Sequence, residues 1–251
     1  HRGVAPYEDV YGSVGPLGAS SSEPAPPPLP PRHKPPNPVT VPSLAEVAPE
    51  AVEWLWSGRL PFGKLAVLDG NPGTGKSTLT MDLAARLTTG RPMPGSTDSS
   101  EPYDVLILNL EDGPGDTIRP RAEAAGADLS RIRVINKAPV SSDGATRFVP
   151  FQIPRDLSYL KGLIQEHGVR LVVIDVLNQF VGRKADTYKD QDMRATLGPL
   201  ADLATMTGTC VLALRHLTKS HRDQGYAMFA GSGSIAIVGL ARAGLIAAEH
   251  P

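Results

Sequence analysis

The chain has 251 residues and a formal net charge of −1, which leaves room for one large α/β domain and a tail. A charge so close to zero excludes a global basic field for nucleic acid, so such contacts would have to come from local loops. The sequence has no stretch of membrane-spanning length, we see no charged-then-apolar segment of the leader type in its first residues, and its single cysteine, Cys210, excludes an intrachain disulfide. We therefore expect a cytoplasmic protein without membrane contact.

The first 41 residues differ in composition from the rest of the chain. Nine prolines fall between Pro24 and Pro38, and apolar residues show almost no periodicity there. Such a segment cannot bury enough surface to offset the entropy lost on ordering. We predict a disordered Pro-rich tail over residues 1–41 and one domain over residues 42–251.

The first elements of the domain lead to a Gly-rich segment. Residues 44–56 are expected to be helical at least in part, and residues 58–64 to turn into a first buried strand, 65–68. Residues 77–87 repeat leucine at helical spacing. A strand and a helix are thus predicted on the two sides of residues 70–76.

Residues 70–77 match the phosphate-binding pattern G-x-x-x-x-G-K-[ST]. The matching residues are Gly70, Asn71, Pro72, Gly73, Thr74, Gly75, Lys76 and Ser77, and Thr78 follows them. In such a loop, backbone N–H groups surround the phosphates at the N-terminus of the following helix. Lys76 would reach the β- and γ-phosphates, and the Ser77 hydroxyl would ligate Mg²⁺. The alternative is an ordinary Gly-rich turn, but the flanking elements favour nucleoside triphosphate binding.

Beyond this loop, apolar runs alternate with helical segments. Strands are predicted at 105–110, 132–135, 171–174 and 210–214. Helices are predicted at 116–125, at 156–167 with Asp156 as its cap, and at 190–207 with an interruption near Gly198 and Pro199. Strands that are continuously apolar and separated by helices indicate a mostly parallel sheet covered on both faces.

Three strands end in a side chain suited to phosphate chemistry. Asp175 would hold Mg²⁺ opposite Ser77, although an aspartate there can also serve as a turn former. Glu111 could orient and deprotonate water, with Asp112 competing for the role and a solvated acidic turn as the alternative. His216 could hydrogen-bond the γ-phosphate as a sensor, or it could be structural.

Two loops and one arginine complete the set of candidates. Loops 181–190 and 219–233 combine basic and aromatic residues with glycines, which suits contact with single-stranded nucleic acid. Ordinary exposed loops of mixed charge have a similar composition, so a loop without a binding role is the alternative. Arg242 lies in an otherwise apolar segment and needs a partner. That partner would be an intramolecular carboxylate or the γ-phosphate bound by a neighbouring subunit.

The order of these motifs resembles that of RecA-like P-loop ATPases. The resemblance is closest to the RepA-type hexameric replicative helicases and related AAA-family ATPases of plasmids, phages and bacterial mobile elements. It covers residues 42–248 and implies an α/β RecA-like core that binds ATP and Mg²⁺. By this resemblance Glu111 is the catalytic base, His216 the γ-phosphate sensor and Arg242 an arginine finger.

The same resemblance implies a homo-oligomeric ring, perhaps a hexamer, that binds single-stranded DNA. RecA-type cores normally carry strands beyond the arginine-bearing one, so the resemblance implies a missing C-terminal part or a reduced module. Two other functions fit the motifs. One is a nucleotide-switched binding or assembly protein with slow turnover, and the other is a small-molecule kinase.

Overall fold

The structure, a computed structural model, describes residues 42–142, 144–182, 189–217 and 236–248. The chain divides into two compact units, residues 1–49 and 50–251. In the first unit, the described part contains one 3₁₀ turn, η2, Leu44–Glu46. The predicted disordered tail, residues 1–41, lies outside the described residues.

The second unit is built on a six-stranded sheet in the order β10-β3-β9-β8-β4-β5. All neighbouring strands in it run parallel. The strands are β3 Leu65–Gly70, β4 Asp104–Asn109, β5 Ile132–Ile135, β8 Val169–Asp175, β9 Cys210–His216 and β10 Ala243–Ala247. The predicted α/β fold with a mostly parallel sheet is confirmed.

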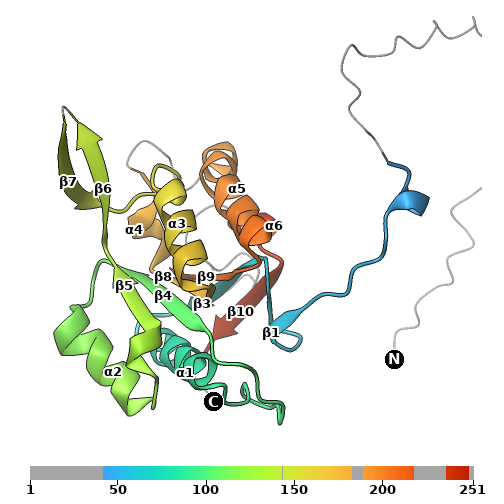
Figure 1. Ribbon diagram of the computed structural model, residues 1–251, viewed down its shortest axis with the longest axis horizontal. Coiled ribbons are helices and arrows are strands. Elements are labelled where there is room, and N and C mark those ends of the chain that lie inside the picture. Colours follow the sequence, from blue (N-terminus) through green and yellow to red (C-terminus); the bar gives the residue numbers. More distant parts are fainter. Residues whose placement is uncertain (1–41, 143, 183–188, 218–235, 249–251) are drawn as a thin grey trace, which may run out of the picture. The chain divides into compact units, whose positions relative to one another are not determined.

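Helices cover both faces of the sheet (Figure 1). One face carries α1 Lys76–Thr89 and α2 Arg119–Ala124, and the other carries α3 Leu157–His167, α5 Asp190–Thr207 and α6 Ala236–Leu240. Adjacent strand residues point to opposite cores: Val172 joins the core under α3 and α5, and Val173 joins the core under α1. This two-sided burial explains why the strands are continuously apolar. None of the described helices is both long and apolar enough to cross a bilayer.

The expected helix over residues 44–56 is wrong beyond the η2 turn. Instead, β1 Trp54–Trp56 pairs antiparallel with β2 Leu60–Pro61. Pro49 lies inside the expected helix, and proline both lacks the N–H of a helical hydrogen bond and disfavours helical geometry in the residue before it. Leu55 is buried, whereas Trp54 is 41% exposed.

The expected interruption of the 190–207 helix is also wrong, because α5 runs continuously through Pro199. A proline inside a helix costs about 3 kcal/mol. Buried Leu197 and Leu200 on the two sides of this point, together with Leu203 one turn on, hold both halves in the core. Burial on both sides of the proline outweighs the local cost.

The connection between β4 and α3 departs from the prediction in three places. The expected helix over 116–125 begins as a π-helical turn, η3 Pro114–Ile118, and continues as α2. After the 3₁₀ turn η4 Leu129–Arg131 and β5, an antiparallel hairpin forms from β6 Lys137–Ser142 and β7 Ala145–Pro150, which we did not foresee. This hairpin projects from the body (Figure 1). Asp156 is the N-terminal cap residue of α3, but its side chain accepts from Gln152 N rather than capping the helix.

A buried ion pair joins β3 to β9 next to the end of both strands. Asp69 lies opposite Arg215 in the strand register. The Nε and Nη2 atoms of Arg215 donate to the two Asp69 carboxylate oxygens at 2.7 and 2.6 Å. The two residues are 4% and 2% exposed, respectively. Removing one partner of such a pair leaves a buried charge without compensation.

We expect Asp69→Leu to lower the free energy of unfolding by about 3–5 kcal/mol, because Arg215 would stay buried without its partner. The double variant Asp69→Leu/Arg215→Met should recover most of that loss. Urea denaturation followed by circular dichroism measures both values. The control is Arg119→Met, which breaks the exposed Arg119–Glu123 pair and should cost about 0–1 kcal/mol. A double variant no more stable than Asp69→Leu would contradict this account.

Candidate nucleotide-binding site

The phosphate-loop residues connect β3 to α1 at the carboxyl edge of the sheet. Gly73 and Gly75 both have φ +82°, a left-handed conformation that residues with a Cβ rarely adopt, and an added Cβ would meet nothing within 4 Å at either position. The backbone is therefore open to a ligand here. The Lys76 ammonium donates to the carbonyl oxygens of Gly70 and Asn71 at 2.8 and 2.9 Å, so it lies within the loop.

The two predicted metal ligands are in direct contact. The Ser77 hydroxyl donates to Asp175 Oδ2 at 2.8 Å, although 98 residues separate the two in sequence. Ser77 lies in the first turn of α1, and Asp175 is the last residue of β8. A hydroxyl and a carboxylate are the hard oxygen donors that Mg²⁺ prefers.

Lys76 and Asp175 are both buried, and burial dominates their electrostatics. Burial lowers the pKa of Lys76, while Asp175, Asp69 and Glu111 oppose this shift. Burial also raises the pKa of Asp175; the Ser77 hydrogen bond opposes that rise, and Glu111 and Asp112 add to it. Asp175 and Glu111, neither of which is paired with an arginine among the described residues, thus place negative charge near Lys76, a setting that favours binding of a further cation.

The loop that carries Glu111 is fixed by its neighbours. Oδ1 of buried Asn109 accepts from the backbone N–H groups of Glu111 and Asp112 at 2.8 and 2.7 Å. Asp112 forms an ion pair with Arg121 of α2 at 2.9 Å. The Glu111 carboxylate itself accepts a hydrogen bond from the Gln179 amide. Glu111 is therefore held by its own side chain as well as through its backbone.

His216 ends β9 directly beside the start of the phosphate loop. It lies opposite Gly70 in the strand register and is half-buried. Its Nδ1 atom is buried, and within the described ranges it has no hydrogen-bond partner. This polar atom is available to a ligand, which is compatible with the expected sensor but also with a structural histidine.

Arg242 does not lie with the other candidates. Its backbone N–H donates to the Leu65 carbonyl at 2.8 Å, at the opposite end of β3 from the phosphate loop. The strand between them spans about 17 Å. The side chain is exposed, and the expectation that it has a partner, either an intramolecular carboxylate or a neighbouring subunit's γ-phosphate, stays a prediction. Arg242 cannot reach the phosphate loop of its own chain.

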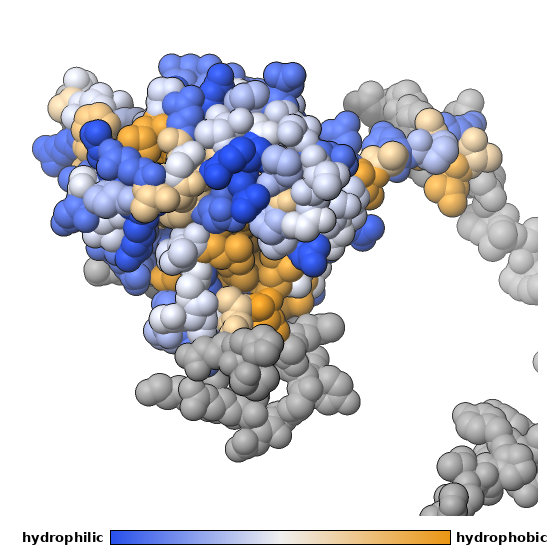
Figure 2. All heavy atoms as spheres, turned by 90° about the horizontal axis from the view of Figure 1, so that it is seen from below, coloured by the Kyte–Doolittle hydropathy of each residue, from blue (hydrophilic) through white to orange (hydrophobic). Residues whose placement is uncertain are grey.

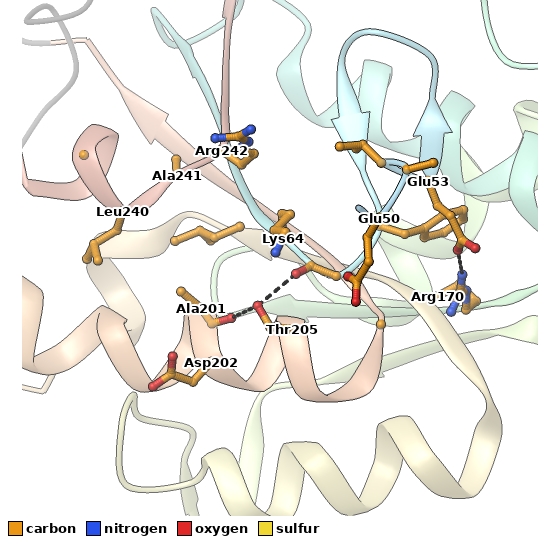
Figure 3. A pocket seen from close by; sticks show the side chains of 17 residues that line it. Glu50, Glu53, Lys64, Arg170, Ala201, Asp202, Thr205, Leu240, Ala241 and Arg242 are labelled. Carbon is orange, nitrogen blue, oxygen red and sulfur yellow. Dashed lines mark hydrogen bonds and ion pairs between the residues drawn. The ribbon is translucent and has the colours of Figure 1, made fainter. Parts of the chain in front are cut away.

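Arg242 lines a cavity of about 700 Å³ at this amino edge (Figure 3). Lys64, Glu50 and Asp202 also line it, and Arg170 closes one side through its contact with Glu53 at 3.7 Å. This cavity is separate from the phosphate loop, because Lys64 and Leu65 line it at the start of β3 and the phosphate loop follows the end of that strand.

A smaller cavity of about 290 Å³ lies between α1 and α2. It begins at Thr78, directly after the phosphate loop, and its walls are largely apolar, with the Arg121 side chain on one side. Its lining consists of Thr78, Met81, Asp82, Arg121, Ala124 and Ala125. A nucleoside attached to phosphates in the loop would find an apolar surface here.

The predicted nucleic-acid loops are mostly outside the described residues, which omit 183–188 and 218–235. Val181, the first residue of loop 181–190, follows α4 Leu177–Phe180, whereas all of loop 219–233 lies outside the described residues. The Leu217 N–H donates to the Gly70 carbonyl at 3.3 Å. Leu217, the residue after β9, therefore lies beside the start of the phosphate loop.

Sequence reasoning missed three residues of this site: Asn109, Gln179 and Arg121. Asn109 could have been found, because a polar residue at the end of a buried strand lies where ligands bind in α/β sheets. The other two are single exposed polar residues on helices, and no pattern distinguishes them from ordinary surface residues.

The residues present fit a magnesium–nucleotide complex. Among the described residues, no group of three histidine, cysteine or acidic side chains could hold a metal alone. Magnesium does not require one, because it is usually bound through one or two carboxylates, substrate phosphates and water. Ser77, Asp175 and the open loop at Gly73 and Gly75 provide such a setting.

Comparisons with known proteins agree with this site. No curated protein matches the chain. A family model described as an AAA domain matches residues 28–222, which include the phosphate loop, Glu111, Asp175 and His216. The match covers well over half of the sequence, and this chain therefore belongs to the AAA domain family of P-loop ATPases.

Proposed function

We propose that this protein hydrolyses ATP in a Mg²⁺-dependent reaction and acts as a DNA-associated motor of the RepA replicative-helicase type. The observation that carries the catalytic part is the 2.8 Å bond between Ser77 and Asp175, beside Lys76. This bond brings the two halves of a P-loop metal site together. The motor part is supported by the order of motifs along the chain.

The carboxyl-edge residues have separate roles in this proposal. Ser77 and Asp175 hold Mg²⁺, which neutralises charge on the phosphates when bound. Lys76 and the loop N–H groups bind the β- and γ-phosphates. Glu111 orients a water and accepts its proton, and His216 hydrogen-bonds the γ-phosphate.

The nucleoside would occupy the cavity between α1 and α2. Its apolar lining and the planar Arg121 guanidinium suit the face of a base. Because Arg121 also pairs with Asp112 at 2.9 Å, the base and the loop of Glu111 would share one side chain. No hydrogen-bonding pattern at this cavity selects adenine; the ATP assignment comes from the family.

Assembly into a ring is supported by the separation of Arg242 from its own phosphate loop. An arginine at the amino edge can serve a phosphate loop only in another subunit. Exposed apolar surface is consistent with assembly: Ile246 on the edge strand β10 is 46% exposed, and Figure 2 shows an apolar patch among hydrophilic residues. We propose that Arg242 acts in trans and that single-stranded DNA contacts loops 181–190 and 219–233.

The first expected result is that single-stranded DNA stimulates steady-state ATP turnover several-fold. In the matched variant Lys76→Ala, turnover should fall to background, because the β- and γ-phosphates lose their cation. Lys161→Ala, on α3, should behave like the wild type. Slow turnover that ignores DNA would contradict the motor and favour a nucleotide-switched assembly protein. Phosphate transfer to a small molecule would favour a kinase.

The second expected result is that Asp175→Asn raises the melting temperature of the free protein but removes the effect of Mg²⁺ on nucleotide binding. The variant should melt about 2–4 °C higher in the absence of nucleotide, because it removes a buried charge worth about 1 kcal/mol. The Ser77 hydrogen bond would be kept by the amide oxygen. Mg²⁺ should no longer increase the stabilisation that ADP gives. Differential scanning calorimetry tests this, with the exposed Asp202→Asn as control; an unchanged Mg²⁺ effect would contradict the metal role.

The third expected result concerns subunit mixing. Arg242→Ala alone should lose about 10³-fold in turnover, and Lys76→Ala should be inactive. After equal mixing with subunit exchange, about one interface in four has both residues intact, so about a quarter of wild-type activity should return. Arg147→Ala is the control for a lost surface arginine. If the mixture stays as inactive as its components although the subunits exchange, Arg242 does not act in trans.

A further inference from the structure

Gln179 has no role in the site as assigned so far, yet its amide donates to the carboxylate of Glu111. We propose that Gln179 is a positioning residue, which holds the Glu111 carboxylate in the direction needed to accept a proton from water. This inference rests on the proposed ATP hydrolysis and on Glu111 as the base.

The backbone of Gln179 is held firmly. It lies on α4, which begins two residues after Asp175. Leu177 and Phe180 of this helix are fully buried, while Gln179 is exposed. The Phe180 ring packs edge-on against Phe151 at 6.2 Å between centroids, and the Phe180 carbonyl accepts from Ile153 N at 2.7 Å. The Gln179 side chain therefore extends from a backbone that is held in place by its neighbours.

Glu111 needs such a partner because the rest of its surroundings fix its backbone alone. Asn109 holds the N–H groups of Glu111 and Asp112, and Arg121 holds the Asp112 side chain. The Glu111 side chain is exposed, and a free glutamate rotates about several torsions. The bond from Gln179 to Oε1 restricts this rotation and leaves Oε2 without a partner among the contacts described.

An amide is chemically suited to this task. It donates to a carboxylate without carrying a charge, so the carboxylate keeps its ability to accept a proton. A lysine or arginine in its place would form a charge-assisted bond, which is stronger and would compete with the water proton. The Gln179 amide therefore orients the base without neutralising it.

This role predicts an effect on the chemical step alone. Gln179→Ala should lower kcat about tenfold, while the Kd for a fluorescent ADP analogue with Mg²⁺ changes less than twofold. Gln179→Glu should lower kcat at least as much, because a second carboxylate would repel Glu111. A merely structural role predicts the opposite for this variant, since glutamate has the same size and the position is exposed.

A double-variant cycle with Glu111→Gln tests whether Gln179 acts through Glu111. Glu111→Gln should itself lower kcat at least about 100-fold. In that background, Gln179→Ala should change kcat less than twofold, because the base it positions is gone. A second tenfold loss would overturn the inference. So would wild-type kcat in Gln179→Glu. Gln165→Glu, an exposed position on α3, controls for the added charge.

Failure of the proposed function gives a different result. If the wild type turns over ATP no faster than Lys76→Ala, hydrolysis itself is wrong, and this inference falls with it. If Lys76→Ala is inactive but Glu111→Gln retains wild-type kcat, the protein is an ATPase and the assignments of Glu111 and Gln179 are overturned.

Discussion

The parallel direction of all six strands determines where chemistry can occur in this molecule. Parallel strands place all their carboxyl ends at one edge of the sheet. The register sets Gly70 opposite His216, and Asn109 opposite Asp175. Residues far apart in sequence thereby meet at this edge. The phosphate loop needs this edge as well, because α1 must begin where β3 ends.

The carboxyl edge of the sheet carries charged side chains that are also buried. Four buried charged residues lie there: Lys76, Asp175, and the paired Asp69 and Arg215. The pair satisfies itself through two hydrogen bonds. Lys76 and Asp175 instead rely on backbone carbonyls and a single hydroxyl. The ion pair between β3 and β9 is therefore fully compensated. Lys76 and Asp175 are only partly compensated, which leaves them able to interact with a charged ligand.

The sequence predicted the parts of this protein that have a repeating or fixed pattern. The phosphate loop has an eight-residue pattern, and the central strands are apolar on both faces, so both were recognisable. The prediction of a helix over residues 44–56 was wrong because Pro49 disfavours helical geometry despite the apolar residues around it. The prediction of a break in α5 was wrong because burial of the leucines around Pro199 outweighs the cost of that proline. Arg242 was expected to need a partner because its segment is apolar in sequence, yet its side chain is exposed next to the half-exposed edge strand β10. Gln179 depends on a contact across 68 residues, which no local pattern encodes.

The separation of the two sheet edges also constrains any assembly. Arg242 directly precedes the edge strand β10, and the phosphate loop follows the far end of the neighbouring strand β3, about 17 Å away. An arginine so placed can meet a phosphate loop only if the amino edge of one subunit faces the carboxyl edge of the next. Such a contact joins different surfaces of the two subunits, so it repeats around a closed ring or along an open filament. A symmetric dimer formed through one shared surface would leave both sites without the arginine.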